Sequence, residues 1–248
     1  MGLVDNLVGF AVDSLNSALD SLYDYDSKGN TAAEYFKKGY SYYEQKDFVN
    51  AFDLFNKASD LGNINATYML GMCYADGQGT EQDNEKAFLF LKKAAEQGQP
   101  GAQMNLGLFY LAGLGTEENK ELGLKWVEKA AEHGGDAAQC ALGVCYLTGL
   151  GTEKNKELGF KWVEKAAEQG NADAQCYLGT CYEDGMGTEQ NKDLALKWYK
   201  KAAEQGNAKA QEFLDNWHED VKQHPKSKKG LIIVIIIVFI ILYIIGNL

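Results

Sequence analysis

The sequence contains no arginine and only two prolines and three histidines among its 248 residues. All 24 basic residues are therefore lysines. Within residues 1–221, 20 lysines stand against 35 acidic residues, a net charge of −15. A body this acidic repels phosphate backbones, so we expect no nucleic acid partner. The shortage of proline beside 27 glycines favours helices separated by regular breaks and argues against a disordered chain.

What the sequence has in abundance is repetition, with a period of 36 residues. This step relates the alanines Ala66, Ala102, Ala138, Ala174 and Ala210, and the glycines Gly71, Gly107, Gly143 and Gly179. Four GxGT turns begin at Gly77, Gly113, Gly149 and Gly185, and four segments similar to KAAEQG end at Gly98, Gly134, Gly170 and Gly206. Self-similarity at a fixed period of this length predicts a solenoid of stacked units.

Each unit predicts two helices. The fixed residues of the first half fall on one helical face, and a glycine follows where a helix C-terminus favours the left-handed conformation. The second half begins after an asparagine, a favoured N-cap, at Asn84, Asn119, Asn155 and Asn191. One large ring recurs in the second helix, and we expect it to fill the gap between units: Phe90, Trp126, Trp162 and Trp198.

The pattern A-x(3)-L-G-x(2)-Y-x(2)-G-x-G-T followed by KAAEQG resembles the Sel-one-like repeat family, relatives of the tetratricopeptide repeats. Four full copies cover residues 64–207. Residues 31–63 look closer to an ordinary tetratricopeptide repeat, because only 32 residues separate Gly39 from Gly71 and the GxGT turn is missing. The resemblance implies an all-α fold, a right-handed α-solenoid of stacked helix-turn-helix repeats. A capping helix at residues 208–221 would close its end.

Residues 1–30 are predicted to form an amphipathic capping helix and a linker to the first repeat. The apolar stripe is Val4, Leu7, Val8, Ala11, Leu15, Ala18, Leu19 and Leu22. The opposite face carries Asp5, Asp13 and Asp20 and no lysine, whereas a helix on a membrane surface is normally basic there. The segment also lacks the positive start and uninterrupted apolar stretch of a secretory signal.

Residues 231–246 are predicted to form one C-terminal transmembrane helix. Leu231 to Ile245 is a run of 15 residues without a charge, and a helix from Gly230 to Leu248 would span about 28 Å. A buried strand is the alternative, but nothing follows the run to pair with it. The preceding basic linker, residues 222–230, is expected on the cytoplasmic side through Lys222, Lys226, Lys228 and Lys229. We therefore expect a single-pass, tail-anchored membrane protein whose repeats face the cytoplasm.

Patterns that would indicate catalysis or metal binding are missing from the sequence. The five cysteines are expected to be reduced, packed thiols, because pairs five residues apart on one helix cannot easily reach bridging geometry. The GxG turns follow helices, so they are turns and not dinucleotide sites. Some proteins with this repeat type are labelled β-lactamases, but S-x-x-K and K-T-G do not occur. We expect no enzyme activity, metal, cofactor or small-molecule substrate.

One candidate binding surface remains, on the first helices opposite their fixed face. Positions equivalent to 65, 69, 72 and 76 vary between copies, and first helices line the concave side of related solenoids. The middle of this surface is small and apolar, while its ends carry larger and charged residues. The candidate partner-binding residues are Met69, Met72, Asp76, Asn105, Tyr177 and Asp184. The alternative is that these positions vary because nothing constrains them.

Together these features predict a membrane-anchored adaptor whose groove binds a peptide or helix of a partner protein. The resemblance supports this class, because family members serve as scaffolds in membrane-associated complexes, including protein quality control at the endoplasmic reticulum. The alternatives are a structural array that associates with itself and, less favoured, a β-lactamase-type hydrolase.

Overall fold

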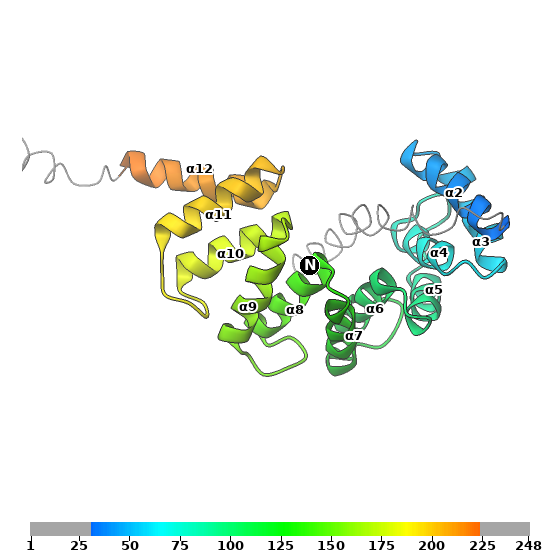
Figure 1. The fold of residues 1–248 in the computed structure, drawn as a ribbon, viewed down its shortest axis with the longest axis horizontal. Coiled ribbons are helices and arrows are strands. Elements are labelled where there is room, and N and C mark those ends of the chain that lie inside the picture. The colour runs from blue at the N-terminus through cyan, green and yellow to red at the C-terminus, as the bar shows by residue number, and fades with distance from the viewer. Residues whose placement is uncertain (1–30, 224–248) are drawn as a thin grey trace, which may run out of the picture.

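The computed structural model describes residues 31–223, and every regular element within them is an α-helix. The helices are α2 (Thr31–Glu44), α3 (Phe48–Asp60), α4 (Ile64–Asp76), α5 (Asn84–Glu96), α6 (Pro100–Ala112), α7 (Lys120–Glu132), α8 (Asp136–Thr148), α9 (Lys156–Glu168), α10 (Ala172–Asp184), α11 (Lys192–Glu204) and α12 (Ala208–Gln223) (Figure 1). The predicted all-α solenoid is therefore confirmed for this part of the chain.

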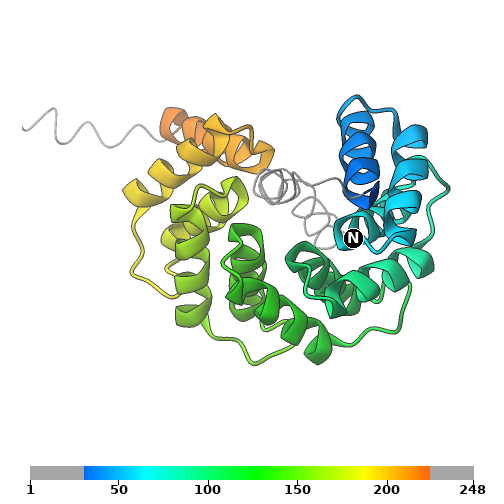
Figure 2. The same cartoon turned by 45° about the vertical axis from the view of Figure 1, so that its right-hand side comes forward.

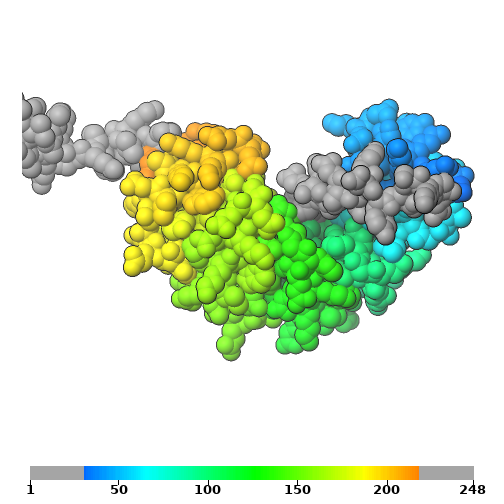
Figure 3. All heavy atoms as spheres, viewed as in Figure 1, coloured from blue at the N-terminus to red at the C-terminus, as the bar shows by residue number. Residues whose placement is uncertain are grey.

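The helices form five successive pairs, α2–α3 to α10–α11, followed by the single helix α12, and the pairs stack into an arc. Figure 2 shows the first helix of each pair along the inner side of the arc and the second helix along its outer side. In Figure 3 the two ends of the array rise on the same side of the molecule, with a hollow between them. Each helix packs mainly against its neighbours in sequence, as expected for a solenoid.

Glycines let the two helices of a pair approach closely. The fixed glycine of each first helix faces the second helix. A Cβ added at Gly107 would lie 2.7 Å from Val127 Cγ2, and one added at Gly143 would lie 2.6 Å from Val163 Cγ2. No real side chain tolerates such distances, so glycine at these positions allows the helix packing. The fixed face predicted from the period is therefore the face that packs within the pair.

The GxGT turns join the two helices of a unit and also touch the preceding unit. Their first glycine ends the first helix in the left-handed conformation, as Gly149 does with φ of 79°. Their second glycine also has positive φ, and it lies against the start of the second helix of the preceding unit. A Cβ on Gly151 would overlap the carbonyl oxygen of Lys120, and one on Gly187 that of Lys156. The second glycine thus serves both turn geometry and the contact between units.

Side-chain caps begin the second helices, as the sequence predicts, with one correction. Asn119, Asn155 and Asn191 accept hydrogen bonds from backbone N–H groups three residues ahead. In the remaining unit the N-cap is Asp83, and Asn84 is the first helical residue. An Asp or Asn side chain performs the same capping chemistry, so the adjacent aspartate takes the position that we assigned to Asn84.

The rings that bridge successive units differ from those expected. Phe52 meets Tyr74 edge-on at 5.3 Å between centroids, and Phe160 meets Tyr182 in the same way at 5.5 Å. Each pair joins a second helix to the first helix of the next unit. In contrast, Phe90 stacks on Tyr74 within its own unit. The tryptophans at the equivalent position are half-buried beneath a lysine, with Lys201 Nζ 4.1 Å from the ring centroid of Trp198.

A hydrogen bond from an exposed glutamine to a buried one recurs between the helices of a pair, and this glutamine ladder is interrupted in the unit at residues 100–135. Gln169 Nε2 donates to Gln139 Oε1 at 2.7 Å, and Gln205 Nε2 donates to Gln175 Oε1 at 2.8 Å. The equivalent donor position in the interrupted unit is His133, and the acceptor, Gln103 Oε1, is buried without a partner among the described residues. The N-cap of the next helix, α8, is Gly135, which provides no side-chain hydrogen bond. The repeat is therefore imperfect at one junction.

Some sequence predictions fall on residues outside the described range. The capping segment 1–30, the transmembrane helix 231–246 and the lysines Lys226, Lys228 and Lys229 lie there. Lys222 lies in the last turn of α12, which extends to Gln223. Within residues 31–223, none of the helices combines the length and the apolar character needed to cross a bilayer.

Candidate functional site: the inner face of the array

The inner strip is the set of first-helix positions opposite the fixed glycines, along the inside of the arc. It comprises Asn65, Met69, Met72 and Asp76 on α4; Gly101, Asn105, Leu108 and Ala112 on α6; Ala137, Ala141, Val144 and Thr148 on α8; and Asp173, Tyr177, Thr180 and Asp184 on α10. Because the fixed glycines pack against the second helices, most of these positions point away from them; Thr180 is an exception, because the Tyr199 hydroxyl on α11 donates to its side-chain oxygen at 3.2 Å. The strip therefore follows the concave side of the array.

The N-terminal end of the inner strip is a polar cluster. Asn105 Nδ2 donates to the Tyr68 hydroxyl oxygen at 3.0 Å and approaches Met72 Sδ at 3.1 Å. Burial raises the pKa of the Tyr68 hydroxyl well above its usual value. Burial also raises the pKa of the Asp76 carboxyl. This end of the strip therefore offers hydrogen-bonding groups set among buried side chains.

The C-terminal end of the inner strip is more open and carries charge. The ammonium of Lys209, on α12, lies 5.4 Å from the ring centroid of Tyr177, a cation–π contact. Tyr177 is half-buried and Asp184 is exposed. Asn207 donates to Asp173 at 2.6 Å, which joins α10 to the N-terminus of α12. Both signs of charge are thus available beside an aromatic ring.

Between these ends the inner strip has no charged residue. On α6 and α8 it consists of small and apolar side chains apart from Asn105 and Thr148. Such a surface gains little from ionic partners and favours the apolar face of a helix or peptide.

The structure brings together some of the six candidate binding residues and separates the others. Met72 and Asn105 are in contact at the N-terminal end, with Asp76 on the same helix as Met72. Met69, Met72 and Asn105 are 0%, 3% and 2% exposed, so their side chains are covered in this structure. Tyr177 and Asp184 lie together on α10, at the other end. The accessible candidates are therefore Asp76, Tyr177 and Asp184.

Two residues of the site were missed by the sequence analysis. Tyr68 lies one position before the strip position Met69, and its ring breaks a pattern that has Met104, Cys140 and Cys176 in later units. Lys209 is itself a strip position, one period beyond Asp173. Extending the 36-residue step by one further unit would have identified it.

The cysteine side chains are poor candidates for chemistry. All five are free and buried, which confirms the predicted packing. Burial raises the pKa of the Cys73 and Cys145 thiols to about 12, so the nucleophilic thiolate is disfavoured. Within residues 31–223, no group of three or more His, Cys, Asp or Glu side chains is arranged to hold a metal ion.

Comparison with protein families shows the same periodicity. A family model described as Sel1 repeat matches residues 30–63, 64–99, 100–135, 136–171 and 172–207. The match includes the first unit, which the sequence pattern set apart because its two helices are joined by a short turn without GxGT. No curated protein matches the chain.

Several solved structures are similar to the chain. The structure of c5321, a protective antigen of uropathogenic Escherichia coli with an SLR fold, has a TM-score of 0.64 and 35% identity, covering 79% of this chain and 42% of that chain. A Sel1 repeat protein from Oxalobacter formigenes has a TM-score of 0.58 and 36% identity, covering 68% and 49%. The immunity protein Pa5087 from Pseudomonas aeruginosa has a TM-score of 0.54 and 25% identity, covering 75% and 70%. The chain thus spans less than half the length of the first two relatives.

Proposed function

The chain belongs to the Sel1 repeat family, and from this premise we propose that it is a protein-interaction scaffold whose inner strip binds a helix or peptide of a partner protein. The proposal rests on the order in which side-chain types occur along the strip. A charge-free, small and apolar middle lies between a hydrogen-bonding end at Asn105 and a charged, aromatic end at Tyr177. This arrangement suits a segment with an apolar face and polar termini.

The relatives support a binding function over catalysis. One is named a protective antigen and another an immunity protein, and neither name is that of an enzyme. The chain itself buries its thiols with raised pKa values, and the sequence has no β-lactamase motif. A hydrolase would need a nucleophile that these residues do not offer.

We propose further that residues 231–246 anchor the scaffold in a membrane, with Lys222, Lys226, Lys228 and Lys229 on its cytoplasmic side. The support is the uncharged run Leu231 to Ile245 beside this group of lysines. Separation of cell membranes in alkaline carbonate tests the anchor. The full chain is expected in the membrane pellet, and a chain ending at residue 223 in the supernatant. Recovery of both chains in the supernatant would contradict the proposed membrane anchor.

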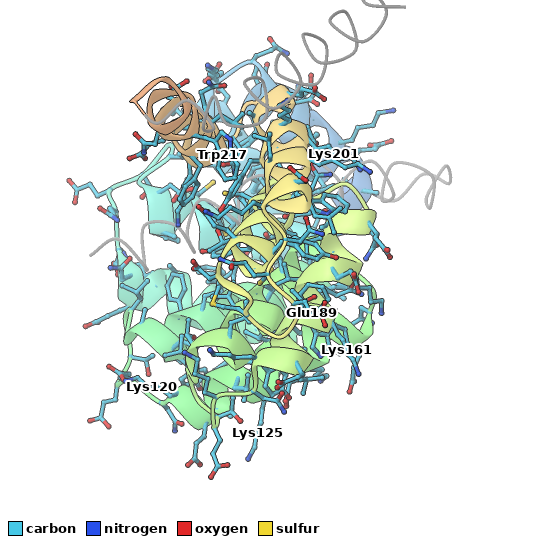
Figure 4. All side chains as sticks on the ribbon, turned by 90° about the vertical axis from the view of Figure 1, so that its left-hand side faces the viewer. Lys120, Lys125, Lys161, Glu189, Lys201 and Trp217 are labelled. Carbon is cyan, nitrogen blue, oxygen red and sulfur yellow. The ribbon has the colours of Figure 1, made fainter. Side chains whose placement is uncertain are left out.

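The binding function is tested by crosslinked recovery of partners from intact cells. The inner variant carries Tyr177→Ala and Asp184→Ala. The matched outer variant carries Lys125→Ala and Lys161→Ala, two exposed residues of the second helices α7 and α9, labelled in Figure 4. We expect a partner that the wild-type chain and the outer variant recover equally and the inner variant recovers at least tenfold less.

Two results would contradict this proposal. Equal recovery by all three chains would place the partner on another surface. Recovery of nothing but further copies of the chain would favour the self-associating array. Circular dichroism of each variant shows whether the helices remain folded, so that a loss of binding is not confused with a loss of structure.

A further inference from the structure

The middle of the inner strip is covered, although it lies on the open side of the described arc. Leu108, Ala137, Ala141 and Val144 are each 5% exposed or less. Their helices pack against second helices through the opposite, glycine-bearing face. Figure 2 places no second layer of described helices inside the arc. A segment from outside residues 31–223 that binds on this open side would account for the burial.

This middle part of the strip is apolar and uncharged, so a segment that covers it needs one apolar face. The other face of that segment should be polar. Residues 3–23 have this character, because their apolar stripe and their aspartates fall on opposite sides of a helix. The run Leu231 to Ile245 is apolar all round, so binding to one strip would leave most of its apolar surface exposed. The amphipathic segment is the better match.

Length and attachment also favour residues 3–23. A helix of 21 residues is about 31 Å long, enough to lie across several first helices spaced about 10 Å apart. Seven residues, 24–30, join it to the start of α2, and seven extended residues reach about 24 Å. The described chain starts at Thr31 with α2, and α2 lies on the inner side of the arc.

We propose that residues 3–23 bind the inner strip of the same chain, with Leu7, Leu15, Leu19 and Leu22 facing α6 and α8. The acidic face of the segment then points out of the hollow. The inference rests on the proposed function, since it makes this segment an internal ligand that occupies the groove until a partner displaces it. A linked ligand competes at an effective concentration in the millimolar range, so an external segment binds only with higher affinity or when the internal one is released.

Photo-crosslinking of the purified full chain tests the internal ligand without any partner. A benzoylphenylalanine replaces Thr148, an exposed position of the inner strip, and mass spectrometry identifies the peptide that it captures. We expect capture of a peptide from residues 3–23 of the same molecule. A mixture of isotopically light and heavy chains distinguishes capture within one molecule from capture between two.

Variants of the segment provide the matched control. Leu15→Asp with Leu19→Asp should lower the crosslink yield at least tenfold and speed amide exchange in α8. Asp13→Asn, on the polar face, should change neither. Capture of residues 231–245, capture of a second copy, no capture, or equal yields from both variants would each overturn the inference. The scaffold proposal is judged separately, because it depends on partner recovery from cells.

Discussion

At the residue scale, stability depends on small departures from a perfect repeat. The glutamine-to-glutamine hydrogen bond is present in the two units where Gln169 and Gln205 donate, although Gln139 Nε2 is itself buried without a partner among the described residues, and the bond is missing where His133 replaces the donor. A buried carbonyl oxygen without a donor costs free energy that its equivalents in other units do not lose. The junction between α7 and α8 is therefore the place to look for gains in stability.

We expect His133→Gln to stabilise the protein. The new amide supplies the donor that Gln103 Oε1 lacks, and one hydrogen bond of this kind is worth about 1 kcal/mol. Urea denaturation followed by circular dichroism measures the change. The matched control is Gln169→Ala, which removes the donor to Gln139 and should destabilise by about 1–3 kcal/mol. A neutral or destabilising effect of His133→Gln would show that the histidine already donates a hydrogen bond to Gln103 Oε1.

The buried cysteines predict low reactivity and lower stability at alkaline pH. Burial raises the pKa of Cys73, Cys145 and Cys181 from the usual value near 9 to about 12. These thiols contribute stability that is complete below pH 9, because they stay protonated in both states. The contribution is lost as the pH rises from 9 towards 12, since only the unfolded chain then releases the protons.

Ellman's reagent and urea denaturation check this prediction. At pH 8 the native thiols should react only after unfolding, while an added exposed thiol, Lys161→Cys, should react at once. The free energy of unfolding should fall between pH 8.5 and 10.5. Rapid reaction of the five native thiols at pH 8 would mean that their burial is not maintained in solution.

At the element scale, the second glycine of a GxGT turn meets two constraints, a left-handed backbone and a close contact with the preceding unit. Comparing two glycine substitutions separates them. Gly151 and Gly170 both have positive φ, at 77° and 101°. A Cβ on Gly151 would also overlap the carbonyl of Lys120, whereas nothing lies within 4 Å of one on Gly170. Gly170→Ala thus reports backbone strain alone, and Gly151→Ala adds a steric clash between units.

We expect Gly170→Ala to cost about 1 kcal/mol and Gly151→Ala at least twice as much. Thermal unfolding followed by circular dichroism compares the two variants. The difference between them measures the interlock of the turn with the preceding second helix. Equal costs would indicate that the turn moves away from α7 without penalty.

At the scale of the whole molecule, net charge opposes the compact state. Residues 1–221 carry a charge of −15, and the ion pairs described within 31–223 lie at the surface with partly or fully exposed side chains, such as Lys57 with Asp53 at 2.6 Å. Exposed pairs contribute little, so repulsion between carboxylates dominates the electrostatic energy. Hydrophobic packing between neighbouring units must exceed this repulsion.

We therefore expect salt to stabilise the array. Raising sodium chloride from 10 to 300 mM shortens the screening length from about 30 Å to below 8 Å and should raise Tm by several degrees. Potassium chloride should act equally, because the effect is screening and not specific binding. A lower Tm in either salt would show that attractive pairs outweigh the repulsion.

The sequence alone determined the repeat, the helix pairs and most of their ends. A 36-residue period fixes which residues are equivalent, and local chemistry fixes the ends, as with the left-handed Gly149 and the cap Asn155. These are short-range effects within one or two turns of helix. The one capping error, Asn84 for Asp83, arose because two adjacent residues can perform the same chemistry.

Only the tertiary structure decided which of these positions are accessible and which cross between units. Periodicity placed Met69, Met72 and Asn105 on the inner face, but their burial depends on what packs over that face. In the same way, the bridging rings proved to be Phe52 with Tyr74 and Phe160 with Tyr182, because ring contacts depend on the rotation between units. A repeat defines the faces of each helix, whereas exposure and contact between units follow from how the helices assemble in three dimensions.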